Sequence, residues 1–169
     1  MNTLILVLRI VHISAGIVWG GGSIVMYFFF GPAVKATNQI GQQFAGYLML
    51  KSKFVMVMTT MATLTVLAGA ILYWLESDGF TSGWMKSSAG IGFAVGGLFG
   101  LVAFISGVVF GQMNKKLAFI GSQVQGKPTP EQLTEIQSLQ KKIAIATRFH
   151  VPSIIITILL MSASRYLLF

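Results

Sequence analysis

The sequence contains no cysteine and only two histidines. Without cysteine, the protein cannot form disulfides, thiolate-ligated iron–sulfur clusters or a covalently attached c-type haem. Charged residues are also scarce: they make up 9% of the 169 residues, whereas a soluble domain carries about 25%. Hydrophobic residues account for 54%. This composition indicates an integral membrane protein.

Carboxylate side chains are also scarce. Only four aspartate and glutamate residues are present, and none lies inside a long apolar stretch. A proton-coupled transporter with an intramembrane carboxylate relay is therefore disfavoured. The sequence also lacks a phosphate-binding Gly-Lys loop, a Ser-His-acid set and paired carboxylates. We favour a protein without independent enzymatic activity, and the enzyme question stays open.

Four apolar stretches are long enough to cross a hydrocarbon core of about 30 Å, which needs roughly 20 helical residues. They cover about residues 3–30, 54–75, 89–113 and 143–168. Their continuous apolar character does not fit the alternation of barrel strands. We predict an all-α integral membrane four-helix up-down bundle, forming a single transmembrane domain over residues 1–169.

The net charge of +8 is distributed unevenly among the connections. The second connection has Lys86 against Glu76 and Asp78. Membrane topology and contact with anionic lipid head groups explain this uneven distribution of charge. We therefore expect no nucleic-acid partner. The same distribution predicts cytoplasmic first and third connections and both termini outside. Basic residues gather in those two connections: Lys35, Lys51, Lys53, Lys115, Lys116, Lys127, Lys141 and Lys142.

Local motifs refine the two lysine-rich connections. Thr129, Pro130 and Gln132 fit a helix start, with Thr at the N-cap, Pro at the first position and Gln three residues after Thr. The fourth helix should therefore begin in the cytoplasm and continue into the membrane. Phe44 and Tyr47 in the first connection indicate a short interfacial helix.

Glycines recur along the third stretch at four-residue steps, which place them on nearly one helix face. Small residues at this spacing allow close packing of helices. The alternative is a flat surface against which a macrocycle lies. The glycines are Gly92, Gly96, Gly100, Gly107 and Gly111.

His12 lies about two turns inside the first stretch, where a full charge would cost roughly 3 kcal/mol at a helix centre. At about 1.5 Å per residue, Met161 lies at a similar depth. Arg9 and Arg165 each lie about one turn closer to the outside. A b-type haem needs axial ligands such as His and Met, and its propionates favour arginine. These residues predict a haem b site, with an interhelical hydrogen bond and core packing as the alternative.

His150 lies near the cytoplasmic end of the fourth stretch, roughly 10–15 Å in depth from His12. The two histidines are therefore not expected to share one haem iron. His150 is a weaker metal-ligand candidate, with Met56, Met58 or Met113 as possible neighbours. The alternative is an interfacial side chain that stabilises a bent helix or faces lipid head groups.

The segment from Arg9 to Gly20 includes His12 and, seven residues later, Trp19 followed by Gly. This pattern resembles the first helix of the copper-resistance protein D (CopD) family and of HemJ-type bacterial membrane proteins linked to haem biosynthesis. The resemblance covers about 20 residues. It implies a haem or metal role for His12 and a location in the bacterial inner membrane. The deeper lysine of HemJ-type proteins has no counterpart in the third stretch.

Three functional hypotheses follow. The leading one is a b-type haem protein that passes electrons, alone or with other membrane subunits of a redox complex. The second is a non-catalytic accessory subunit of a bioenergetic or transport complex, which would use its glycine faces and the aromatic run at 27–30 as contacts. The third is copper handling, because the thioethers of the second stretch suit Cu(I).

Overall fold

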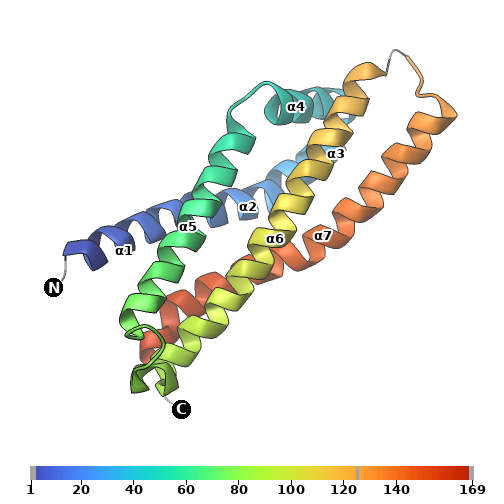
Figure 1. The fold of residues 1–169 in the computed structure, drawn as a ribbon. Coiled ribbons are helices and arrows are strands. Elements are labelled where there is room, and N and C mark those ends of the chain that lie inside the picture. The colour runs from blue at the N-terminus through green and yellow to red at the C-terminus, as the bar shows by residue number, and fades with distance from the viewer. Residues whose placement is uncertain (1–2, 125, 168–169) are drawn as a thin grey trace.

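The computed structural model describes residues 3–124 and 126–167. Within them, four helical segments are long and apolar enough to cross a membrane: Thr3–Ala36, Phe54–Glu76, Ser88–Gln123 and Pro130–Tyr166. Both chain ends lie toward the same end of the bundle as the α5–α6 connection, and the α6–α7 connection lies toward the other end (Figure 1). The predicted all-α four-helix architecture is confirmed.

The first segment is a composite helix. It consists of α1 (Thr3–Gly16), the π-helical η1 (Ile17–Gly21), α2 (Gly22–Val25), the π-helical η2 (Met26–Phe30) and α3 (Gly31–Ala36). The sequence placed the end of this span near residue 30, but the helical segment continues through α3 to Ala36. Pro32 is the second residue of α3 and lies two residues after the end of the π-helical η2.

A sharp turn at Asn38, whose φ is 47°, reverses the chain into α4 (Asn38–Leu50). This helix is the one expected in the first connection, and Phe44 stacks on Phe30 with ring centroids 5.8 Å apart. The chain then enters α5 (Phe54–Glu76) and crosses to the short 3-10 turn η3 (Gly83–Lys86).

The last two long helices form a hairpin that extends past the apolar stretches. α6 (Ser88–Gln123) runs about ten residues beyond the predicted end at residue 113. α7 (Pro130–Ala163) begins with the predicted capping box, in which Thr129 and Gln132 exchange hydrogen bonds of 3.0 and 3.3 Å. It ends in the 3-10 turn η4 (Ser164–Tyr166).

The core draws one buried residue from each long segment: Trp19, Ala62, Ala103 and Ile154. Trp19 meets Phe104 edge-on, with ring centroids 6.4 Å apart. Each segment contains an apolar stretch of 18 residues, and only 11–22% of the residues in these stretches are buried inside the bundle. The remaining apolar surface suits contact with lipid.

The glycine face of α6 is filled by α7 side chains. A Cβ on Gly92 would lie 2.5 Å from Ser164 Oγ, and one on Gly100 would lie 3.5 Å from Thr157 Cγ2. Close helix packing therefore accounts for this face. Gly111 lies outside it, since no neighbouring atom among the described residues would approach its Cβ within 4 Å.

Candidate functional site

His12 is held between α1 and α5. Its Nδ1 lies 2.7 Å from the carbonyl oxygen of Thr65. Its ring covers Gly69, one turn further along α5, where a Cβ would lie 2.7 Å from Cε1 and 3.0 Å from Nδ1. The absence of a side chain at Gly69 is therefore what allows the ring to occupy this position.

This contact determines the tautomer of His12. A carbonyl oxygen only accepts hydrogen bonds, so Nδ1 carries the proton and donates it to Thr65. In the neutral ring, Nε2 then keeps its lone pair. Among the described residues, no group forms a hydrogen bond with Nε2. Histidines that bind metals commonly have this arrangement, with the other ring nitrogen bonded to a backbone carbonyl.

Arg9 lies one turn outward from His12 and forms an ion pair with Glu76, the last residue of α5. The two side chains are 33% and 32% exposed. The pair joins α1 to α5 at the end of the bundle nearest the termini. The guanidinium predicted to contact a haem propionate thus already contacts a carboxylate of the protein itself.

Met161 lies on α7 and faces α6, where a Cβ on Gly96 would lie 3.4 Å from the Met161 methyl group. Arg165 is exposed in η4. The described contacts do not bring either residue to His12, whose ring faces α5. Their roles as second iron ligand and propionate partner stay predictions.

Tyr73 of α5 donates its hydroxyl to the carbonyl of Gly90 in α6, at 3.3 Å, which links these antiparallel helices near the termini. Along α5, Gly69 lies about 6 Å inward from Tyr73, and along α6, Gly96 lies about 9 Å inward from Gly90. Both predicted ligands therefore lie in the half of the bundle nearest the termini.

His150 occupies a different junction. It is 5% exposed, with Nδ1 2.9 Å from the Ala103 carbonyl and Nε2 3.2 Å from Ser23 Oγ. Its ring stacks on Phe110 at 5.9 Å and covers Gly107, whose Cβ would lie 2.9 Å from Cε1. The side chain therefore links α7 to both α6 and α2.

The interpretation of His150 as an interfacial residue facing lipid head groups is wrong, because the side chain is buried inside the bundle. Ser23, its partner, lies 11 residues after His12, which corresponds to about 16 Å along the first segment. The two histidines therefore contact the first segment at levels that are well separated along its length. A metal role for His150 stays a prediction, and both of its ring nitrogens have partners within the protein.

Sequence reasoning missed the partners of both histidines. Gly69 was not singled out, although a glycine amid the apolar residues of α5 marks a close approach. Thr65 was expected to hydrogen-bond within its helix, which it does through its hydroxyl to the Met61 carbonyl, but its own carbonyl was not expected to be the partner of His12. Ser23 was also missed; it is a polar residue that follows three successive glycines. Glu76 was counted only as a loop charge.

Comparison with known proteins identifies the family. Residues 6–164 match the family described as "Predicted integral membrane protein (DUF2269)". No curated protein and no solved structure matches the chain. A relationship to the CopD or HemJ-type families stays an expectation from the first-helix pattern. A four-helix bundle with long apolar segments fits this description, and the match covers nearly the whole chain, which therefore belongs to this DUF2269 family of integral membrane proteins.

Proposed function

We propose that the protein binds one b-type haem in the half of the bundle nearest the termini, with Nε2 of His12 as an axial ligand. The observation that supports it is the 2.7 Å contact between His12 Nδ1 and the Thr65 carbonyl. This contact leaves Nε2 as the ligating nitrogen. A haem held there would supply a one-electron iron couple, and the protein would pass electrons alone or within a redox complex of the bacterial inner membrane.

Each residue around His12 has a defined task in this proposal. Thr65 orients the ring, because its carbonyl accepts a hydrogen bond from the Nδ1–H group of His12. Gly69 leaves room for the ring to reach that carbonyl. Arg9 and Arg165, at the water boundary, are suited to pair with propionates. For Arg9, a propionate would compete with Glu76.

Met161 is the candidate second ligand because counting residues from the sequence places it at a depth similar to that of His12. Its thioether side chain now lies against Gly96. This side chain has three rotatable bonds and can therefore adopt other positions. Met161→Leu nearly conserves volume and should retain the fold. If Met161 ligates the iron, this change should shift the reduction potential of the bound haem.

The test is the visible spectrum of the purified protein. We expect a Soret band and reducible α and β bands in the wild type, and their loss in His12→Ala. The matched control is Ile13→Ala, which removes a side chain that is 58% exposed on the same turn. Haem lost from both variants, or retained in His12→Ala, would contradict ligation by His12.

The accessory-subunit hypothesis is the second candidate. It is favoured by the aromatic run of η2, where Tyr27, Phe28 and Phe29 are 45%, 51% and 68% exposed. Large exposed aromatics suit contacts with lipid or with another subunit. A wild-type protein purified without haem, but together with stoichiometric partner subunits, would favour this role.

Copper handling has less support from the geometry. Met58 and Met61 both pack against the core around Trp19, whereas Met56 is 59% exposed. Met56 is therefore not part of that core cluster, and a Cu(I) site needs its thioethers to converge. Copper found by elemental analysis in the wild type would revive this hypothesis.

A further inference from the structure

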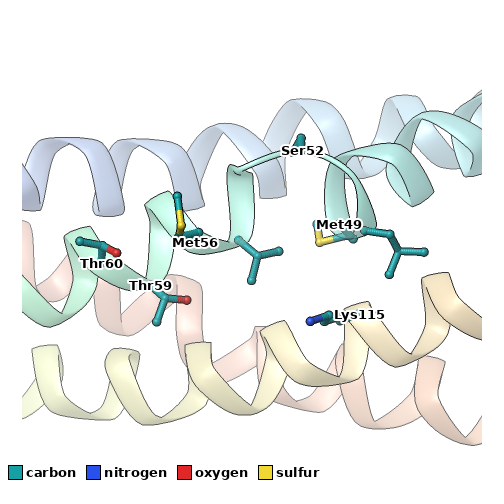
Figure 2. A pocket seen from close by; sticks show the side chains of 8 residues that line it. Met49, Ser52, Met56, Thr59, Thr60 and Lys115 are labelled. Atoms are coloured by element: carbon teal, nitrogen blue, oxygen red, sulfur yellow. The ribbon is translucent and has the colours of Figure 1, made fainter.

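A hollow of about 440 Å³ lies between α6 and the connection from α4 to α5. Figure 2 shows Met49 and Met56 on one side of it, with Lys115 of α6 across from them. Leu50 and Val55 add to its apolar lining. A smaller hollow of about 310 Å³ adjoins it and shares Leu50 and Lys115. Lys115 thus stands beside both depressions, and the first combines this apolar lining with the hydroxyls of Ser52, Thr59 and Thr60.

The hollow lies at the boundary between hydrocarbon and head groups. The 23 residues of α5 span about 33 Å, close to the thickness of a hydrocarbon core. Lys53 immediately precedes this helix, and Glu76 ends it. The start of α5 therefore marks one membrane surface. A lysine at this level can extend along apolar surface and keep its ammonium group among head groups.

Charge favours an anionic occupant. Lys115 is exposed, and none of the described carboxylates lies within ion-pair distance of it. Its neighbour Lys116, in contrast, pairs with Glu135 at 2.6 Å. The stretches 35–53 and 115–148 contain nine lysines and arginines but only two glutamates. The connections at this end of the bundle therefore carry a large excess of positive charge, and Lys115 and Lys116 bring part of it to the two hollows.

We propose that this hollow binds an anionic phospholipid from the leaflet that faces the lysine-rich connections. The phosphate would contact Lys115, and an acyl chain would lie along Val55 and Met56. A juxtamembrane lysine strengthens binding of anionic lipid about fivefold, which corresponds to ~1 kcal/mol. The apolar lining accounts for why a lipid, rather than a free anion, occupies the site.

Lipid retention measured by native mass spectrometry tests this. The detergent-purified protein is titrated with phosphatidylglycerol or with phosphatidylcholine of the same chain length. The wild type should bind phosphatidylglycerol more tightly, and Lys115→Gln should weaken that binding about fivefold. Lys127→Gln removes the same charge from an exposed position of the α6–α7 connection and should have no such effect.

Three results would overturn the proposal. The first is equal retention of the two lipids by the wild type. The second is an equal loss of binding in Lys115→Gln and Lys127→Gln, which would indicate a diffuse surface potential. The third is displacement of phosphatidylglycerol by millimolar inorganic phosphate, which would indicate a free-anion site. Size-exclusion profiles of both variants should match the wild type, since both side chains are exposed.

Discussion

The ring of His12 packs directly against Gly69, where a Cβ atom would lie 2.7 Å from Cε1. His150 and Gly107 repeat this relationship with a corresponding distance of 2.9 Å. In both pairs, Nδ1 contacts the carbonyl four residues before the glycine. The pairs differ at Nε2, which has a serine partner only in His150. The first pair therefore retains a lone pair for a ligand, and the second is a junction between helices.

Gly69→Ala should displace the ring of His12, because a contact below 3 Å cannot be accommodated without movement. Overpacking of this kind typically costs about 1–3 kcal/mol. We expect a lower melting temperature in detergent and, under the haem proposal, reduced haem content. Thermal unfolding and the Soret absorbance measure the two effects separately.

Gly97→Ala is the control for this change, because no described atom outside its own helix would lie within 4 Å of the new Cβ. Replacing a helical glycine with alanine at such an open site should be neutral or stabilise by about 0.5–1 kcal/mol. A loss of stability in Gly97→Ala equal to that in Gly69→Ala would show that helical glycine itself, rather than the histidine contact, is responsible.

Substitutions at the junction around His150 should lower the stability of the protein by different amounts. Ser23→Ala removes only the bond at Nε2, and interhelical bonds of this kind average about 0.6 kcal/mol in membrane proteins. His150→Ala removes the contacts with both neighbouring helices and leaves a cavity, at a cost of about 2 kcal/mol or more. Unfolding in mixed detergent micelles measures both variants. Equal effects of the two substitutions would contradict the central role of the imidazole.

The sequence predicted the elements of the fold better than their ends. Hydrophobic length located all four spans, and the capping box at Thr129 located the start of α7. The extension of α6 to Gln123 was missed because Asn114, Lys115 and Lys116 interrupt the apolar stretch, and the helix beyond them is supported by tertiary packing. Ile120 of this extension is 6% exposed, and Lys116 pairs with Glu135 of α7.

The candidate site was predicted only in part, because depth along a helix can be counted from sequence but rotation about its axis cannot. Counting residues places His12 and Met161 at a similar depth, and the Tyr73–Gly90 contact puts the helices they face in the same half of the bundle. It did not reveal that His12 faces α5 while Met161 faces α6. That difference arises from how the helices pack, and apolar spans have too little polar patterning to indicate it.

Topology can be tested with engineered cysteines, because the native chain contains none. The positive-inside rule predicts that Ser122→Cys resists an impermeant thiol reagent added to intact cells, whereas Thr81→Cys reacts. Both positions are exposed, and the neighbouring Ser82 is unsuitable because its hydroxyl is buried. Permeabilised cells supply the labelling control for Ser122→Cys. The reverse pattern would invert the orientation of the bundle.

The ion pair between Arg9 and Glu76 should contribute modestly, since both side chains are about a third exposed. Double-mutant cycles of exposed pairs typically give about 0.2–1 kcal/mol. We expect a coupling energy in this range from Arg9→Gln, Glu76→Gln and the double variant, measured by unfolding in detergent. Raising the ionic strength should reduce this coupling, because the Debye length falls to about 3 Å at 1 M salt.

The charge-exchanged double variant, Arg9→Glu with Glu76→Arg, distinguishes the attraction between opposite charges from the effect of having polar side chains at these positions. It should recover much of the stability lost in the single reversal Arg9→Glu, because opposite charges again face each other across α1 and α5. Under the haem proposal, however, the exchange should still weaken haem retention, because the arginine suited to a propionate has moved to α5. Full recovery of both stability and haem would show that Arg9 acts only through Glu76.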